Sequence, residues 1–433
     1  MHHFQMIVEN RGFLNMLMNT ENAVIADFHV HSRFSMATSR KMDLENMVVA
    51  AQHKGIDLLA TGDFTHPEWM NEIQQKLVPA ESGWYRLKPE IESRLVERIP
   101  ETCRSPVRFM LVGEISCIYR QGGKVRKGHY LIFMPHIEAA KRFCARLSQY
   151  GNLCSDGRPI LGISAVQLLE MVLEQATEAF VVPAHIWTPW FSLFGSKSGF
   201  DSVEECFGDL SDQIFALETG LSSDPPMNRA ISGLDRFTLI SNSDAHSPAH
   251  LGREANVFYG ERSFSGIRKA LDGTRPDDFA GTIEFFPEEG KYHHDGNQAC
   301  HIRSHPNQSL QWENRCPVCG KPLTIGVLNR CLSLSDREAN DCSKLPFTYS
   351  IPLLEIISQL TGRGVHTKTV QNAYFSLLSK LGPELDILHR KTVSEIEEKA
   401  DPSLAHAIAN MRNRNVHIEP GYDGVYGQII VKI

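Results

Sequence analysis

The sequence contains no hydrophobic run that approaches the roughly 20 apolar residues of a membrane-spanning helix, although the chain has 433 residues. Its first twenty residues lack the basic start, apolar centre and small-residue cleavage site of a signal peptide, so we expect residues 1–21 to be a short extension. An excess of positive charge is also missing, because 44 Lys and Arg stand against 51 Asp and Glu. A membrane protein and a uniformly cationic binder are therefore both excluded.

A disulfide framework is missing as well. The chain has ten cysteines, but most are scattered, as expected for free thiols in a reducing compartment. We therefore predict a cytoplasmic protein. The cysteines that do gather lie in a histidine-rich stretch near residue 300, namely Cys300, Cys316 and Cys319.

From residue 24 to about 285, short apolar runs alternate with helical patterns. Strands separated by helices are typical of parallel strands, and seven such runs predict a barrel-like α/β domain. Within it, we expect a helix that starts after Asp43 and ends at Gly55, and a long helical region over residues 68–101. Residues 107–135 are expected to form a β-hairpin with its turn at Gly122-Gly123. Functional residues of such barrels collect at the carboxyl ends of the strands.

Metal-ligand residues stand at most of these strand ends. The first strand ends in His29 and His31, and residues two apart in a strand point to the same side. His129 begins its strand, but a turn at Gly122-Gly123 brings it within a residue or two of the partner of Glu114. The six imidazoles and three carboxylates are enough for two or three metal ions with bridging carboxylates. The nine candidate ligands are His29, His31, Asp63, His66, Glu114, His129, His185, Asp244 and His246.

The short motifs HVH, TGD, GE, KGHY, PAH and SDAH resemble the PHP superfamily of metal-dependent phosphoesterases. Longer phrases over residues 22–433, such as DFHVHSRFSMATS and LISNSDAHSPAHLGREAN, are similar to its endonuclease Q branch. The resemblance implies a PHP-type distorted (β/α)7 barrel over residues 22–287, a zinc-binding domain over 288–345 and a helical domain over 346–433. In the superfamily, the residues corresponding to Asp63 and His66 are often adjacent, which makes His66 the weakest candidate ligand.

The ligand types favour phosphoester hydrolysis without a Ser or Cys nucleophile. Divalent metals lower the pKa of water from about 15.7 towards 7, and two ions about 4 Å apart can hold the attacking hydroxide and the leaving oxygen. Imidazole favours Zn or Mn over Ca, and Mg is a further candidate. The resemblance implies cleavage of DNA on the 5′ side of uracil, hypoxanthine, xanthine or an abasic site. The residues expected to act in this reaction are Asp63, Glu114, Asp244 and His246.

Two loops after the ligands are candidates for DNA contacts. Residues 32–41 offer Arg33, Ser35 and Lys41 to phosphate oxygens. Residues 187–200 combine aromatic side chains with Ser196 and Lys197. Those aromatics either stack an extruded base or only pack beneath the loop.

The motif CPVCG predicts a structural zinc held by Cys316 and Cys319. Cys300 is the third expected ligand and His293 our choice for the fourth. The alternatives left open are His294, Cys331 and Cys342.

Two other functions compete with the DNA-repair endonuclease. One is a small-molecule phosphatase of the histidinol-phosphate type, which uses the same kind of cluster but has no evident use for a zinc domain and a helical tail. The other is a non-catalytic, zinc-dependent DNA-binding protein, which the complete ligand set disfavours. For the endonuclease, the expected partner is damaged DNA, double- or single-stranded, and the resemblance favours a monomer. The sequence leaves open whether a sliding clamp recruits it.

Overall fold

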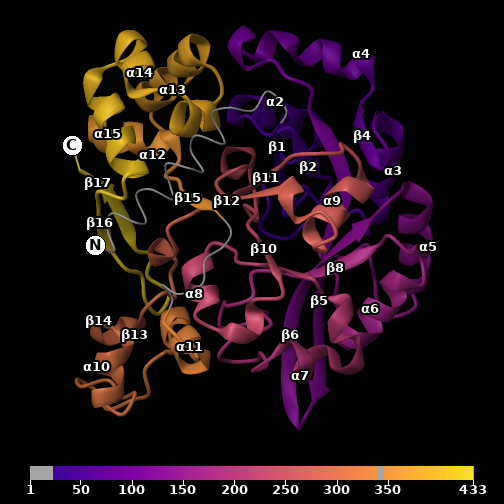
Figure 1. Ribbon diagram of the computed structural model, residues 1–433, viewed down its shortest axis with the longest axis vertical. Coiled ribbons are helices and arrows are strands. Elements are labelled where there is room, and N and C mark those ends of the chain that lie inside the picture. Colours follow the sequence, from indigo (N-terminus) through magenta and orange to yellow (C-terminus); the bar gives the residue numbers. More distant parts are fainter. Residues whose placement is uncertain (1–22, 339–345, 433) are drawn as a thin grey trace.

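The computed structural model describes residues 23–338 and 346–432 and places a barrel beside two smaller regions (Figure 1). Seven strands make up the barrel wall. Their bounds are β1 Val24–Asp27, β2 Leu58–Ala60, β5 Arg108–Gln121, β6 Lys124–Met134, β8 Phe180–Pro183, β9 Ala216–Glu218 and β10 Thr238–Ile240.

Hydrogen bonds close these seven strands into a ring. β1 pairs with β2 and β2 with β5 in parallel, whereas β6 runs antiparallel to both β5 and β8. Ile186 N donates to Glu218 O (3.1 Å) and joins the ends of β8 and β9, and β9 pairs in parallel with β10. The ring closes where His31 N donates to Ala245 O (3.0 Å) and Ala245 N to His29 O (3.2 Å). The predicted PHP-type distorted barrel is thus confirmed, and the antiparallel β6 is its main distortion.

Helices and further strands surround the ring. The helices are α2 Leu44–Lys54, α3 Pro67–Lys76, α4 Pro89–Glu92, α5 Ile137–Leu147, α6 Ala165–Leu173, α7 Val203–Phe207, α8 Pro225–Arg229 and α9 Phe264–Leu271. The additional strands are β3 Leu77–Pro79, β4 Trp84–Leu87, β7 Ile160–Leu161, β11 Ala255–Phe258 and β12 Phe279–Glu284.

Local signals in the sequence placed several of these elements correctly. Asp43 caps α2 by accepting from Asn46 N, and Gly55 ends the helix in a left-handed conformation (φ 86°). The β5–β6 hairpin turns at Gly122-Gly123, as predicted. The predicted helical region 68–101 is wrong over residues 77–87, where the chain forms the antiparallel pair β3–β4 that extends the sheet beside β5. The chain is helical again at α4 and continues as a 3₁₀ helix over Ser93–Arg98.

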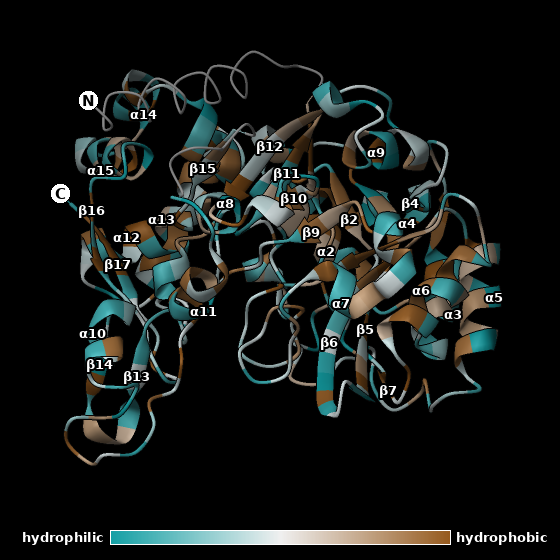
Figure 2. Ribbon diagram, turned by 60° about the horizontal axis from the view of Figure 1, so that its bottom comes forward, coloured by the Kyte–Doolittle hydropathy of each residue, from teal (hydrophilic) through white to brown (hydrophobic). Residues whose placement is uncertain are grey.

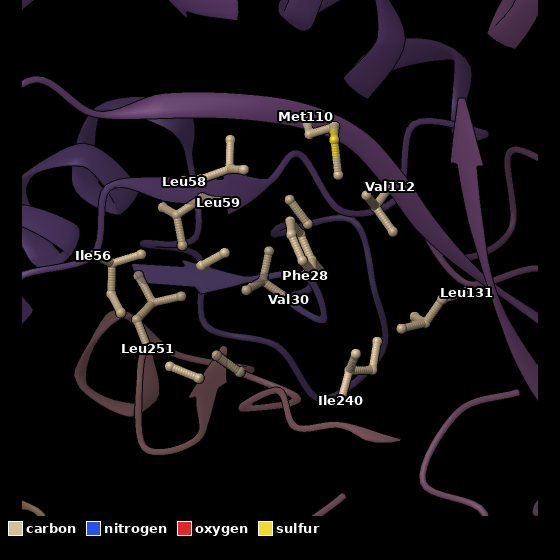
Figure 3. Packing of buried hydrophobic residues seen from close by; sticks show 14 of the residues in the cluster. Phe28, Val30, Ile56, Leu58, Leu59, Met110, Val112, Leu131, Ile240 and Leu251 are labelled. Atoms are coloured by element: carbon tan, nitrogen blue, oxygen red, sulfur yellow. The ribbon is translucent and has the colours of Figure 1, made fainter. Parts of the chain in front are cut away.

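Aliphatic and aromatic side chains fill the space inside and behind the ring (Figure 3). Phe28, which directly follows β1 and precedes His29, is fully buried and meets Phe133 edge-on at 5.5 Å. Val30, Leu131 and Ile240 are also buried around it. This packing fixes the strand ends from which the polar residues project.

The chain beyond the barrel forms two regions. The first holds β13 Asp295–Asn297, β14 Ile302–Ser304, α10 Pro306–Gln311 and α11 Val327–Leu334. The second holds α12 Leu353–Thr361, α13 Lys368–Leu381, α14 Val393–Lys399, α15 Pro402–Arg412, β16 Val416–Glu419 and β17 Gln428–Val431. Between them, β15 Phe347–Tyr349 returns to the barrel sheet and pairs in parallel with β12.

Figure 2 shows the first of these regions, with α10, β13 and β14, extending away from the barrel helices. Its α11 is tied to the barrel through Arg330, which donates to the carbonyl oxygens of Phe194 and Phe200 (3.0 Å each). Among the described residues, no helix has both the length and the apolar character required to cross a membrane.

Candidate metal centre and active site

Seven of the nine predicted ligands meet at the carboxyl ends of the barrel strands. They form three groups within which the candidate ligand atoms lie within 4.8 Å of one another. Glu114 belongs to two groups and His31 to two, so the groups form one continuous cluster. The groups are His29 with His31 and Glu114, His31 with Asp244 and His246, and Glu114 with His129 and His185.

Glu114 lies at the centre of this cluster. Its Oε1 is 2.7 Å from His129 Nδ1 and 3.2 Å from His185 Nε2. Its Oε2 is 3.3 Å from His31 Nε2 and 3.5 Å from His29 Nε2. Each carboxylate oxygen therefore faces a separate pair of imidazoles, which is the arrangement of a bridging ligand.

Asp244 completes the side of the cluster that opens to solvent. Its Oδ1 is 3.1 Å from His31 Nε2, 3.4 Å from His29 Nε2 and 3.6 Å from His246 Nδ1. The side chains of Asp244 and His246 are each 29% exposed, whereas His29, His31 and Glu114 are almost completely covered. A substrate therefore reaches the cluster past Asp244 and His246.

Asp63 lies behind His31 and does not join the three groups. Its Oδ1 is 3.1 Å from His31 Nδ1, the nitrogen that faces away from Glu114 and Asp244. Its Oδ2 accepts from Ser32 N, Ser32 Oγ and Ser35 Oγ at 2.6 to 2.9 Å. Burial acts against ionisation, but His31 and the hydrogen bonds from Ser32 lower the pKa of Asp63 below its ordinary value. In this geometry Asp63 orients His31 as a carboxylate partner.

His66 is also outside the three groups. It stands at the start of α3, its ring stacks on Phe34 at 4.4 Å, and its Nε2 is 3.3 Å from Cys154 O. The two residues between Asp63 and His66 carry the chain from the strand end into the first turn of α3, which separates the imidazole from Asp63.

Two residues that the sequence did not single out support the cluster. Glu218 places both carboxylate oxygens 3.1 Å from His29 Nδ1 and also accepts from His185 N (2.7 Å). Arg158 Nη1 lies 3.0 Å from Glu114 Oε2. Glu218 ends β9, so the rule that located the other ligands at strand ends would have found it. Arg158 lies in a loop that has no pattern to mark it.

Three of the predicted site residues have left-handed backbone conformations, which non-glycine residues seldom adopt. The φ angles are 38° at Asp63, 30° at His185 and 47° at Asp244. Each residue follows a barrel strand. Such strain costs on the order of 1–3 kcal/mol per residue and is typical of functional sites.

The residues of the cluster fit a group of divalent metal ions. His29 Nε2 is buried without a hydrogen-bond partner among the described residues, yet it faces carboxylate oxygens of Glu114 and Asp244. Burial lowers the pKa of His129 to about 4, whereas the carboxylates around His29 and His31 raise the pKa of both rings well above the ordinary value in spite of their burial. Burial opposes ionisation of Glu114, but His129 and Arg158 hold its pKa well below the ordinary value. A mixed imidazole and carboxylate donor set suits Zn, Mn or Fe.

The three residues of the first loop that were predicted to contact DNA have different surroundings. Arg33 Nη2 pairs with Glu72 (2.5 Å), and Ser35 Oγ is buried against Asp63. Lys41 is exposed. Of the three residues predicted to contact DNA here, Lys41 presents an uncovered cation, and Ser35 supports the ligand shell.

Ser196 and Lys197 line a cavity of about 540 Å³ between the tip of the β5–β6 hairpin and α11. The Oγ atoms of Ser196 and Ser198 are buried without a hydrogen-bond partner among the described residues. The charged residues of the wall are Lys124, Arg126, Lys197, Asp201, Glu205 and Arg330. Four cations against two anions make this wall positive.

The predicted structural zinc ligands are partly brought together. The sulfur atoms of Cys300, Cys316 and Cys319 lie within 4.8 Å of one another. His293 is not part of this group; it is buried beside His294, with ring centres 5.3 Å apart, and burial lowers its pKa to about 3. The fourth ligand stays a prediction, with His294 and the buried Cys331 as alternatives, while Cys342 lies outside the described residues.

Comparisons with known proteins find similar chains. The family model for the MJ0043 C-terminal domain matches residues 352–415. The uncharacterized protein MJ0043 of Methanocaldococcus jannaschii is 35% identical over 255 residues, which cover 57% of this chain but only 31% of the relative. The chain thus spans about a third of that relative's length.

Two solved structures are similar along almost the whole chain. The lesion-specific endonuclease PfuEndoQ from Pyrococcus furiosus is 30% identical, with a TM-score of 0.81, and the match covers 94% of this chain and 95% of that one. An endonuclease Q bound to a 27-mer duplex with an abasic lesion at its active site is also 30% identical, with a TM-score of 0.81 and coverage of 95% and 97%.

Proposed function

Since the chain belongs to the endonuclease Q family, we propose that it is a metal-dependent DNA-repair endonuclease that hydrolyses the phosphodiester 5′ to a damaged nucleotide. The proposed lesions are the deaminated bases uracil, hypoxanthine and xanthine, and abasic sites. The observation that carries the proposal is the position of Glu114, which links two groups of imidazoles at the mouth of the barrel. A non-catalytic DNA-binding protein has no need for such a shared carboxylate.

The residues of the three groups would hold two or three divalent ions, with Zn, Mg and Mn as the candidates. When bound, such ions polarise the phosphate and make water a nucleophile near neutral pH. Glu218 would orient the ring of His29, and Asp63 the ring of His31, each through the Nδ1 atom of that ring. His66 would have no direct part, because its ring is stacked on Phe34.

Other side chains at the mouth of the barrel would bind the reacting phosphate and transfer protons during the reaction. The Arg158 side chain is 25% exposed and touches Glu114, so its free donors can reach a phosphate oxygen. His246 Nδ1 lies 2.9 Å from Asp244 O, a carbonyl that can only accept, which leaves Nε2 as the unprotonated nitrogen towards the substrate. These two residues, with Asp244, form the exposed side of the site.

The positive cavity at the hairpin would bind the DNA backbone several nucleotides from the cleaved phosphodiester. Lys127 N donates to Ser198 O (3.3 Å), and the side chains of Lys124 and Lys197 are exposed at its rim. Arg126 and Lys124 stand three and five positions before His129 in β6, which is about 10–16 Å of extended chain. That distance corresponds to roughly three to five base steps of DNA.

One chain would be sufficient for the reaction, because every residue of the three ligand groups comes from the same chain. We also assign one structural zinc to Cys300, Cys316 and Cys319, with His293 as the predicted fourth ligand. The zinc would fix the two ends of the segment from Cys300 to Cys319 to each other, since no disulfide among the described residues does so.

The test uses a 5′-labelled duplex with one uracil, incubated with Mg²⁺, Mn²⁺ or Zn²⁺, beside an undamaged duplex. We expect a single cut on the 5′ side of uracil that is abolished by Asp244→Asn and retained by Asp212→Asn, a control at a 90% exposed carboxylate. Melting curves check that both variants fold. Release of phosphate from small monoesters without DNA cleavage would instead support the small-molecule phosphatase, and undiminished cutting by Asp244→Asn would contradict the proposed site.

A further inference from the structure

Met36 has the largest exposed fraction, 72%, among the exposed large hydrophobic side chains of the described chain. It lies in the loop that directly follows His31. An isolated exposed apolar residue is normal on a protein surface. The position of Met36 beside buried metal ligands is what makes its exposure informative.

The backbone on both sides of Met36 is fastened to the active site. Ser35 Oγ donates to Asp63 Oδ2 (2.9 Å) and lies 3.3 Å from His31 Nδ1. On the other side, Ser39 N donates to His246 O (2.8 Å). Met36 is therefore flanked by residues that contact His31, Asp63 and His246.

The loop is also tied to the segment that carries Arg158. Met36 N donates to Asp156 Oδ1 (3.2 Å), and the same oxygen accepts from Arg158 N (3.0 Å). Gly157 N donates to Phe34 O (2.9 Å). Ala37 has a left-handed φ of 60°, a conformation that persists only where surrounding contacts impose it. The Met36 side chain thus projects into solvent from a fixed backbone.

We propose that Met36 is a wedge that enters the base stack of duplex DNA and fills the space left when the damaged nucleotide is extruded. This inference rests on the proposed function. The scissile phosphate must lie against the ligand cluster, so the base stack next to the lesion must lie beside the residues that follow His31. Proteins that unstack DNA insert apolar side chains, including Met, between base steps.

The chemistry of Met suits this role. Its side chain is apolar and unbranched, so it can slide between bases and adapt to different neighbours. The fixed loop gives it a defined direction without an ordering cost at binding. A lesion in single-stranded DNA is already unstacked, so it requires no wedge. Met36 should therefore matter for duplex substrates alone.

The experiment compares one uracil-containing strand, free and annealed to its complement, under single-turnover conditions with Mn²⁺. We expect Met36→Ala to lower the cleavage rate on the duplex by about tenfold or more, because no side chain then replaces the stacking that is lost when the damaged base is extruded. The rate on the single strand should stay within about twofold of the parent enzyme, and Met36→Leu should restore the duplex rate. Leu310→Ala, at a 62% exposed position on α10, is the matched control.

A second readout follows extrusion directly. A 2-aminopurine placed beside the uracil should brighten on binding of the parent enzyme and less so with Met36→Ala. Equal losses on both substrates, or no loss on the duplex, would overturn the wedge. If the parent enzyme cuts neither substrate at uracil, the proposed function fails instead, so the two failures are distinguishable.

Discussion

Glu218 orients the ring of His29 through Nδ1: both carboxylate oxygens lie 3.1 Å from this nitrogen, and both side chains are buried. The Nδ1 proton therefore points to Glu218, and Nε2 is left to face Glu114 and Asp244. Asn242 Nδ2 donates to the same carboxylate (2.8 Å) and fixes it in turn.

We expect Glu218→Gln to lower the affinity of the cluster for Mn²⁺ by about 10- to 100-fold, as is typical when a carboxylate behind a ligating histidine is removed. Calorimetric titration of metal-free protein with Mn²⁺ measures the change, and circular dichroism checks the fold. Glu170→Gln, at an exposed position of α6, should bind Mn²⁺ like the parent. Unchanged affinity in Glu218→Gln would show that His29 does not need this partner.

Gly157 lies against the carboxylate of Asp63. A Cβ atom at this position would lie 2.4 Å from Asp63 Oδ2 and 2.5 Å from Ser35 Oγ. Gly157→Ala should therefore displace the carboxylate that orients His31, with a loss of about 1–3 kcal/mol in the free energy of unfolding and a lower cleavage rate. Gly162→Ala is the matched control, because a Cβ there meets no atom within 4 Å. Urea unfolding and uracil-dependent cutting measure the two effects, and parent-like behaviour of Gly157→Ala would contradict this geometry.

The ligands that could be predicted from the sequence are those fixed by local geometry. His29 and His31 share a face because they are two residues apart in a strand, and His129 follows from the hairpin register, in which it pairs with Ser116. His185 and Asp244 follow from the convergence of strand ends. These relationships need only the period of a strand and one tight turn.

The remainder depends on contacts that no local pattern encodes. Arg158 reaches Glu114 from an irregular loop. Glu218 is different, because it ends β9 and was overlooked although the strand-end rule that located His185 and Asp244 covers it. His66 matched a ligand type, but the start of α3 directs it to Phe34. The β3–β4 pair was mistaken for helix although Pro79 and Gly83 interrupt a helical pattern there. The burial of Leu77 and Trp84 is decided by tertiary packing.

His389 makes stability depend on pH at a place far from the metal cluster. It lies in the π-helical turn Asp386–Arg390, is buried, and places Nε2 3.1 Å from Ser350 Oγ. Burial, with Arg412 and Arg390 nearby, lowers its pKa to about 3. In the unfolded chain the His389 imidazole has its ordinary pKa of about 6.5. The protein therefore keeps its full free energy of unfolding above that pH and loses part of it as the pH falls towards 3.

Because of this histidine, we expect the free energy of unfolding to fall by about 2 kcal/mol between pH 7 and pH 5. Urea unfolding at the two pH values measures the loss, and His389→Asn should reduce the difference while His406→Asn, at an exposed position of α15, should not. An equal pH dependence in His389→Asn and the parent would place the titrating group elsewhere.

The salt dependence of DNA binding tests the positive cavity at the β5–β6 hairpin. Lys124 and Lys197 are exposed at its rim, whereas Arg126 is engaged by Glu205 (2.6 Å) and lies over the ring of Phe200 at 4.0 Å. The two lysines are therefore the residues free to meet phosphates. Each phosphate contact contributes about 0.9 to the slope of log affinity against log salt for duplex DNA, so replacing both lysines by Ala should reduce that slope by about 2.

Phosphate contacts carry no information about the base. The double substitution should therefore weaken binding to damaged and undamaged duplexes by the same factor and leave the preference for the lesion unchanged. Fluorescence anisotropy over a range of KCl concentrations measures both quantities. The paired control replaces Lys380 and Lys399, two exposed lysines of the helical region, and should leave the slope at its parent value. A slope unaltered by the Lys124 and Lys197 substitutions would exclude this cavity from the DNA path, whereas a changed lesion preference would place it beside the damaged base.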